Sequence, residues 1–349
     1  MPAPTPPFPI AFVTTELRPG GAERNLVALA RGLNRAQFTP RVYSLAPPPA
    51  KEQSELVELL DEAGIEVKCI GVKRPRQFFT AVRQLRRTLK ERPPALIQSF
   101  LFHANVVGAV AARGMNIPVV AGLRVAQREQ VRSLVERRLV GSIKRFVCVS
   151  ESVANVAAKH GGLPREKLIV IPNGIDPKRF ANIAPADLTQ LGVRAGQKVV
   201  LFIGRLDRQK GVDVLIDAAR SFLPERGDVT LLIVGDGDAH AALQQQVEAL
   251  SLTQQVVSAP WQPNPLAMIA AAEVMAIPSR WEGMSNVLME AISLGRPVVA
   301  TDVEGVRDLL SPEGHEWIVP VEDSDALAAK ISALLDAPET VNEIVEANR

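Results

Sequence analysis

The 349-residue sequence has few cysteines, histidines and aromatic residues, and each shortage excludes a class of protein. Its two cysteines, Cys69 and Cys148, cannot form a disulfide framework, and we interpret both as buried thiols because each lies in an apolar, strand-like run. The four histidines show no metal-ligand spacing, so we expect no metal site. Aromatic residues make up 4% of the chain, which argues against base-stacking surfaces for single-stranded nucleic acid.

The sequence also lacks the long apolar segments that membrane insertion requires. No apolar run reaches about 18 residues, so we expect no transmembrane helix. The first nine residues are rich in proline and lack the basic and apolar regions of a secretory signal. We therefore expect a cytoplasmic protein with a disordered N-terminal segment over residues 1–9.

Charge is divided unevenly along the chain, although the net charge is only +2. Residues 1–172 contain 26 Lys and Arg against 13 Asp and Glu, whereas residues 173–349 contain 14 against 25. A basic half favours an anionic partner, which could be a membrane surface, a nucleic acid or an acidic substrate.

Short apolar runs alternate with amphipathic helical patterns from residue 10 to about residue 335. This alternation is typical of parallel sheets built from βαβ units. The run PNGIDP at residues 172–177 interrupts the pattern as a linker would, and the alternation then restarts. We predict an α/β fold with two doubly wound, Rossmann-like domains, residues 10–172 and 173–335. They are expected to face each other across a ligand-binding cleft at the carboxyl ends of the strands.

Two glycines, Gly20 and Gly21, lie in the loop PGGAER between the first predicted strand and the first helix. Glycines let a backbone approach a ligand closely, and the helix amides that follow favour an anion. A plain tight turn would explain the same residues, and the G-x-G-x-x-G fingerprint of dinucleotide-binding proteins is absent.

A second loop, GRLDRQKG at residues 204–211, follows the first strand of the second half. Arg205 and Lys210 are five residues apart between two glycines, and two fixed cations near a helix start would neutralise a diphosphate. The alternative is a solvated loop of mixed charge.

The third motif, WEGMSNVLME at residues 281–290, combines a loop and a helix start. Glu282 lies in the loop, and Glu290 lies in an apolar helical segment, where a lone charge would be costly to bury. Sugar and ribose hydroxyls would satisfy the two carboxylates. Alternatively, Glu282 caps the helix and Glu290 lies on the surface.

Together these motifs resemble glycosyltransferase family 4, whose members have the GT-B fold. Glu282 and Glu290, with seven residues between them, are similar to the E-x₇-E element of retaining glycosyltransferases. The loops PGGAER and GRLDRQKG and the PNGID linker match the family in order, and the resemblance spans residue 10 to about residue 335.

The resemblance implies that the chain transfers a sugar from a nucleotide-sugar donor with retention of configuration. We expect a UDP- or GDP-linked donor and no metal or other cofactor, because two cations could replace a divalent ion. The resemblance assigns catalytic roles to Glu282 and to His103, which we place at a strand end. Four residues would contact the donor phosphates: Arg205, Lys210, Gly20 and Gly21. The donor sugar and ribose would contact Gly283, Met284, Ser285, Asn286, Val287, Leu288 and Glu290.

The family usually ends in a helix that crosses back to the first domain, whereas this chain stops at Arg349. The resemblance therefore implies that residues 336–349 hold the start of such a crossover. The sequence Asp236-Gly237-Asp238 has the form of a metal-binding D-x-D motif, but we interpret it as a turn at a strand end.

The basic half is expected to bind the acceptor, which we predict to be a lipid-linked, lipopolysaccharide-type or polysaccharide glycan. Residues 76–92 place an apolar stripe on one side of a helix and Arg83, Arg86, Arg87 and Lys90 on the other. Such a face suits the anionic inner surface of the plasma membrane as a further partner. The alternative is a stripe that packs on the sheet beneath solvated charges.

Three other functional classes stay open on the sequence alone. A nonhydrolysing sugar-nucleotide epimerase shares the two-domain design, whereas a dinucleotide-dependent oxidoreductase would need a fingerprint that is absent. A nucleic-acid-binding protein would account for the basic half and would leave the loops of the acidic half unexplained, so we expect no nucleic-acid partner.

Overall fold

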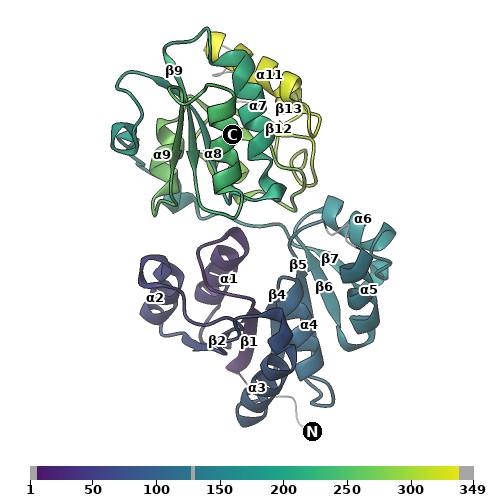
Figure 1. The fold of residues 1–349 in the computed structure, drawn as a ribbon. Helices are drawn as coiled ribbons and strands as arrows, with labels where there is room; N and C mark the ends of the chain where they lie inside the picture. Colours follow the sequence, from purple (N-terminus) through teal and green to yellow (C-terminus); the bar gives the residue numbers. More distant parts are fainter. Residues whose placement is uncertain (1–5, 127–129, 338–349) are drawn as a thin grey trace. The chain divides into compact units, whose positions relative to one another are not determined.

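The computed structural model describes residues 6–126 and 130–337. The chain divides into two compact units, Met1–Gly174 and Ile175–Arg349, so the division lies two residues after the predicted linker boundary (Figure 1). Most of the predicted C-terminal segment, residues 338–349, lies outside the described residues, as do residues 1–5.

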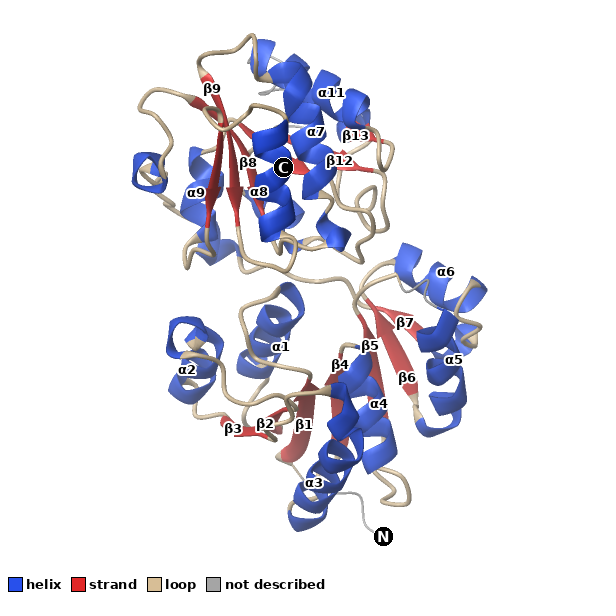
Figure 2. Cartoon of the chain, in the orientation of Figure 1, coloured by secondary structure: helices blue, strands red, loops and turns tan. Residues whose placement is uncertain are grey.

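The first unit is built on a parallel sheet with strand order β3-β2-β1-β4-β5-β6-β7 in the described part of the chain (Figure 2). Its strands are β1 (Phe8–Thr14), β2 (Phe38–Ser44), β3 (Glu66–Cys69), β4 (Leu96–Phe100), β5 (Val119–Leu123), β6 (Arg145–Cys148) and β7 (Leu168–Val170). Its α-helices are α1 (Gly21–Gly32), α2 (Glu55–Glu62), α3 (Phe78–Glu91), α4 (Phe102–Ala111), α5 (Gln130–Leu139) and α6 (Glu151–Lys159).

The second unit contains another parallel sheet, whose described strands have the order β10-β9-β8-β11-β12-β13. The strands are β8 (Lys198–Ile203), β9 (Val229–Val234), β10 (Val256–Ala259), β11 (Val274–Ile277), β12 (Val298–Thr301) and β13 (Ile318–Val319). The α-helices are α7 (Val212–Phe222), α8 (His240–Ala249), α9 (Pro265–Ala271), α10 (Asn286–Ser293) and α11 (Ser324–Asp336).

Both sheets reverse their winding direction once, and each reversal brings two loops together. In the first unit the reversal lies between β1 and β4, and in the second it lies between β8 and β11. Loops that leave the carboxyl ends of two such strands form the usual ligand site of an open α/β sheet. The topology therefore places the loop after β8 beside the loop after β11. The prediction of doubly wound, Rossmann-like α/β domains is confirmed.

Apolar residues on both faces of the strands hold the second sheet between two layers of helices. In β8, Val200 and Phe202 pack with the core beneath α7, α8 and α11, whereas Val199 and Leu201 pack with the core beneath α9 and α10. Alternation of side chains along a strand produces this division. Burial of this kind stabilises by roughly 1.5–3 kcal/mol for each large apolar side chain.

The structure corrects the predicted disordered segment and adds a strand that was not predicted. The strand β1 begins at Phe8, although residues 1–9 were predicted to be disordered, because Phe8 N–H donates to the Gln37 carbonyl and Ala95 N–H donates to the Pro9 carbonyl. The two-residue strand β13 was not predicted, because two apolar residues are too few to show the hydrophobic periodicity of a strand.

Candidate functional site

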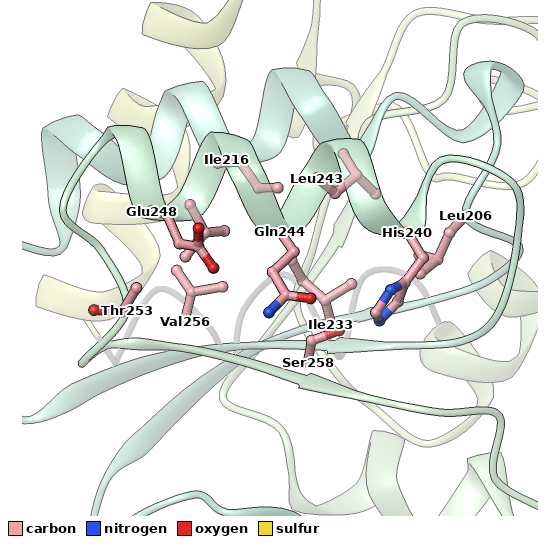
Figure 3. Close-up of a pocket in the computed structure, with 11 residues that line it drawn as sticks. Leu206, Ile216, Ile233, His240, Leu243, Gln244, Glu248, Thr253, Val256 and Ser258 are labelled. Atoms are coloured by element: carbon pink, nitrogen blue, oxygen red, sulfur yellow. The ribbon is translucent and has the colours of Figure 1, made fainter.

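A cavity of about 330 Å³ lies between α8 and the strands β9 and β10 of the second unit (Figure 3). Its lining is largely apolar, with Gln244, Glu248 and His240 along the helix side. None of the residues predicted to bind the donor lines this cavity. The candidate site is therefore built from the loops at the carboxyl edge of the sheet.

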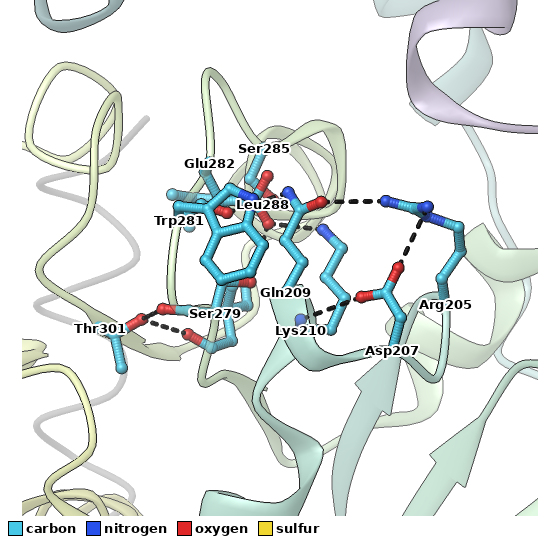
Figure 4. Close-up of polar contacts among 11 residues, drawn as sticks. Arg205, Asp207, Gln209, Lys210, Ser279, Trp281, Glu282, Ser285, Leu288 and Thr301 are labelled. Carbon is cyan, nitrogen blue, oxygen red and sulfur yellow. Dashed lines mark hydrogen bonds and ion pairs between the residues drawn. The ribbon is translucent and has the colours of Figure 1, made fainter. Parts of the chain in front are cut away.

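The central feature of that edge is an ion pair between Lys210 and Glu282 (Figure 4). Lys210 ends the short 3₁₀ turn Arg208–Lys210 after β8, and Glu282 lies in the loop after β11. The distance from Lys210 Nζ to Glu282 Oε1 is 2.5 Å, and the side chains are only 19% and 7% exposed. Partial burial strengthens the attraction between the two charges and makes either charge costly to leave alone.

The Glu282 carboxylate is held in place by a second donor. Ser279 Oγ donates a hydrogen bond of 2.8 Å to Glu282 Oε1, the oxygen that also faces Lys210. The Thr301 hydroxyl, at the end of β12, donates in turn to the Ser279 carbonyl. Residues from the loops after β8 and β11 and from the end of β12 therefore hold this carboxylate in place (Figure 4).

Arg205 lies in the same loop as Lys210 and is far more exposed. Its guanidinium donates to Gln209 Oε1 at 3.0 Å and pairs with Asp207 at 3.1 Å, and its side chain is 68% exposed. Gln209 also donates to the Trp281 carbonyl at 3.0 Å, which joins the two loops. The structure therefore brings Arg205, Lys210 and Glu282 to one edge, with only the latter two shielded from water.

The residues after Glu282 are placed by a helix cap and by core packing. Ser285 Oγ accepts from Leu288 N at 3.4 Å, so Ser285, and not Glu282, caps α10. Glu290 is buried, which excludes the alternative of a surface carboxylate. The Leu288 side chain packs in the apolar core, so only its backbone can face a ligand.

Four more of the predicted donor residues belong to this segment: Gly283, Met284, Asn286 and Val287. Gly283 is packed against Gly305, where a Cβ atom would lie 2.2 Å from the Gly283 carbonyl oxygen. Val287 is partly buried against the same apolar core as Leu288. The loop backbone is thereby fixed next to the ion pair.

In the first unit, Gly21 is the first residue of α1, so the helix begins within the predicted loop. Gly20 is the N-cap, and its carbonyl accepts from Arg24 N at 2.9 Å. A Cβ atom on Gly20 would lie 2.4 Å from Glu23 Oε2, so the buried Glu23 carboxylate lies against this glycine. An anionic ligand at this helix start would meet that carboxylate.

His103 lies in the first turn of α4, just after β4, and not in the strand end itself. The preceding Leu101 has a φ of 70°, a conformation that side-chain-bearing residues rarely adopt. Burial lowers the pKa of His103, and the neighbouring Arg132 guanidinium lowers it further. The imidazole is therefore neutral at pH 7.

Buried polar groups fix the start of α4. Ser99 Oγ donates to Asn105 Oδ1 at 2.8 Å, and Asn105 Nδ2 donates to the Gly122 carbonyl at 3.0 Å. Both side chains are almost fully buried, so each hydrogen bond is costly to lose. This network ties α4 to the ends of β4 and β5.

Metal-binding geometry is not found in the described residues. No three His, Cys, Asp or Glu side chains gather there in a way that could hold an ion. Asp236 lies in the loop after β9, where its carboxylate accepts from Trp261 N at 3.4 Å.

Sequence reasoning missed Ser279, Gln209 and Thr301. Polar residues at strand ends and in turns are common, and their partners are known only once strands that are distant in the sequence are paired. Arg280 was also missed, although an arginine between an apolar strand and a tryptophan is a signal that could have been followed.

The two halves of the chain match two family models. Residues 19–179 match the model described as "Glycosyltransferase Family 4", and residues 185–349 match the model described as "Glycosyl transferases group 1". The matches together span nearly the whole sequence.

The chain is also similar to known glycosyltransferases and to solved structures. The chain is 23% identical to the Escherichia coli UDP-Gal:alpha-D-GlcNAc-diphosphoundecaprenol alpha-1,3-galactosyltransferase, over 82% of this chain and 79% of that protein. It is 29% identical to a 2-deoxystreptamine glucosyltransferase of Streptomyces kanamyceticus, over 75% and 73%. The crystal structure of Anabaena HepE in complex with UDP-glucose superposes with a TM-score of 0.83 and 25% identity, over 98% and 93%.

We predict that Gly211→Ala destabilises the second unit and disturbs the loop after β11. Gly211 has a φ of 63°, and an added Cβ would lie 2.0 Å from the Pro278 carbonyl oxygen. The combined strain should lower the free energy of unfolding by about 1–3 kcal/mol, measured by urea denaturation. Gly227→Ala is the control, because nothing lies within 4 Å of its added Cβ. Equal stability of the two variants would contradict the prediction.

A second prediction concerns Glu136, a buried residue of α5 close enough to Arg132 for their charges to interact. Burial raises the pKa of Glu136 to about 7 from 4.5, while Arg132 acts in the opposite direction. The neutral carboxyl group therefore contributes stability that is fully present below pH 4.5 and is lost as the pH rises through 7.

Glu136→Gln should accordingly match the wild-type stability near pH 4.5 and exceed it at pH 8, by at most about 3 kcal/mol. Urea denaturation at both pH values measures the difference. Glu91→Gln, which removes an exposed carboxylate on α3, is the control and should show no such pH-dependent gain. A gain for Glu136→Gln that does not change with pH would refute the assignment.

Proposed function

Because the chain belongs to the glycosyltransferases with the GT-B fold, we propose that it transfers a sugar from a UDP- or GDP-linked donor to a glycan or lipid-linked acceptor. The observation that carries this proposal is the shielded pair of Lys210 and Glu282 at the reversal point of the second sheet. A cation and a carboxylate side by side match the two chemical parts of such a donor, the diphosphate and the sugar hydroxyls.

The reaction requires a stabilised leaving group. Negative charge grows on the departing diphosphate, and fixed cations aimed at that position lower the barrier. Lys210 and Arg205 come from one loop, and the start of α10 contributes backbone amides nearby. When the donor binds, the Lys210 ammonium exchanges Glu282 for phosphate oxygens, and Glu282 becomes available to a sugar hydroxyl.

Metal independence and retention of configuration are part of the proposal. Two cations can neutralise the two charges of a diphosphate in place of a divalent ion. Retention rests on the resemblance of the Glu282–Glu290 element to retaining enzymes. Glu290, buried in the first turns of α10, would take the ribose hydroxyls.

His103 of the first unit is a neutral hydrogen-bonding group. Because its pKa is lowered, one ring nitrogen can accept a hydrogen bond from a sugar hydroxyl at neutral pH. We assign it a contact with the reacting sugar. Gly20 and Gly21 would contact the phosphates through their backbone, once the Glu23 carboxylate has moved away from Gly20.

The proposed acceptor class draws on the relatives. The name of the Escherichia coli relative includes alpha-D-GlcNAc-diphosphoundecaprenol, and that of the Streptomyces relative includes 2-deoxystreptamine. The basic surface of the first unit favours the anionic, lipid-linked class over the small polar one.

The test of the donor site uses the two cations separately. Lys210→Ala should lower the turnover of a UDP- or GDP-sugar by roughly 10²–10³-fold, and Arg205→Ala by about 10²-fold because its charge is more solvated. Both rates should be unchanged by EDTA. Arg208→Ala is the matched control, since it removes an exposed cation from the same loop. Turnover of Lys210→Ala within about twofold of the control would contradict the proposal.

A membrane surface is proposed as a partner of the first unit. In α3 the apolar stripe packs inward, with Leu85 and Leu89 fully buried, which agrees with the alternative of a stripe packed beneath solvated charges. Phe79 of the same helix is 82% exposed. In α5, Val131 and Leu134 are exposed at 75% and 46%, beside the exposed Arg138. No helix in residues 6–126 and 130–337 is both long and apolar enough to cross a membrane.

Exposed apolar residues beside cations should give weak, salt-sensitive binding to anionic vesicles. We expect sedimentation with phosphatidylglycerol vesicles at low salt, loss of binding at high salt, and weaker binding for Phe79→Ser and Val131→Ser. Leu29→Ser removes a 46% exposed residue on α1 and should bind as the wild type does. Absence of vesicle binding at low salt would exclude this partner.

A further inference from the structure

Arg280, in the loop after β11, has all of its side-chain donors in use. The guanidinium donates to both carboxylate oxygens of Asp213 at 2.8 and 2.7 Å. It also donates to both oxygens of Glu322, one of them at 3.0 Å, and to the Arg208 carbonyl at 2.9 Å. These five bonds account for its five N–H groups. The side chain is only 12% exposed.

These partners belong to separate parts of the second unit. Asp213 lies in the first turn of α7, Arg208 lies in the turn that carries Lys210, and Glu322 lies between β13 and α11. Glu322 has a φ of 65°, a strained conformation that persists only where surrounding contacts hold it. One side chain therefore fastens three loops together.

Two further hydrogen bonds connect Arg280 and its neighbour Trp281 to the loop that carries Lys210. Arg280 N–H donates to the Gln209 carbonyl at 2.8 Å, and Gln209 Nε2 donates back to the Trp281 carbonyl at 3.0 Å. Residues 208–210 and 280–282 are thus bound to each other at successive positions. Lys210 and Glu282 are the last residues of the two segments, so their separation depends on this connection.

We propose that Arg280 is a positioning residue of the donor site, which holds the Lys210 and Glu282 segments at the separation that a nucleotide sugar needs. The role in donor binding rests on the proposed function, whereas the anchoring of the two loops rests on the hydrogen bonds described above. Without Arg280, the Asp213 and Glu322 carboxylates lose the cation between them, and the two loops lose their common anchor.

The ionisation of the partners is consistent with this role. Hydrogen bonds from Arg280 lower the pKa of Asp213 and of Glu322, and the two carboxylates raise the pKa of Arg280. All three groups are therefore charged at neutral pH, and the connection stays intact over the range in which the enzyme would be assayed.

The first experiment measures the loops without any substrate. Hydrogen–deuterium exchange of the full chain should show faster exchange of residues 205–211 and 278–285 in Arg280→Ala than in the wild type. Arg226→Ala is the matched control, because it also removes a two-pronged arginine–aspartate pair, with Asp336, far from these loops in the sequence. Exchange of the two loops at the wild-type rate in Arg280→Ala overturns the proposal.

The second experiment measures catalysis with the donor that the wild type uses. Arg280→Ala should lower kcat/KM for the donor by about 10- to 100-fold at a temperature where it is fully folded, and Arg280→Lys should lose less. Arg226→Ala should stay within about twofold of the wild type. A loss in Tm for Arg280→Ala with kcat/KM equal to that of Arg226→Ala would show a purely structural role and overturn the proposal.

The two readouts separate this inference from the proposed function. If the loops loosen in Arg280→Ala but the wild type transfers no sugar, the proposed function fails while the mechanical role of Arg280 stands. If Arg280→Ala does not fold, Glu322→Gln replaces it, since this change removes one charge and keeps an acceptor. Unchanged loop exchange and kcat/KM in Glu322→Gln would then overturn the inference.

Discussion

The shielded ion pair of Lys210 and Glu282 is the interaction on which the functional account depends. At this separation the attraction is about 7 kcal/mol for an effective dielectric near 20, before desolvation is subtracted. The pair holds a cation and a carboxylate at one place, and each charge neutralises the other. We propose that a ligand that carries both an anion and hydroxyl groups takes over each partner when it binds.

Much of this arrangement could be predicted from the sequence because it follows from topology. The alternation of short apolar runs with amphipathic helical patterns predicted the parallel sheets, and runs such as β2 and β11 are strands of those sheets. Two doubly wound sheets then require a reversal of strand order, and the loops after β8 and β11 must meet there. That rule alone brings Lys210 close to Glu282.

The rest depends on contacts that no local pattern encodes. Arg280 meets Asp213 and Glu322 across 67 and 42 residues of sequence, and neither partner belongs to a motif. Leu288 was predicted to contact the donor because it lies in the E-x₇-E element, yet packing directs its side chain into the core. Glu23 was overlooked, because only the folded chain shows its carboxylate against Gly20.

The most direct test of the account is a crystal structure of the chain with a bound UDP- or GDP-sugar. The account predicts that Lys210 Nζ leaves Glu282 and lies about 3 Å from a phosphate oxygen, while the Glu282 carboxylate accepts from a sugar hydroxyl. A bound donor whose diphosphate lies elsewhere, with Lys210 still paired to Glu282, would contradict it.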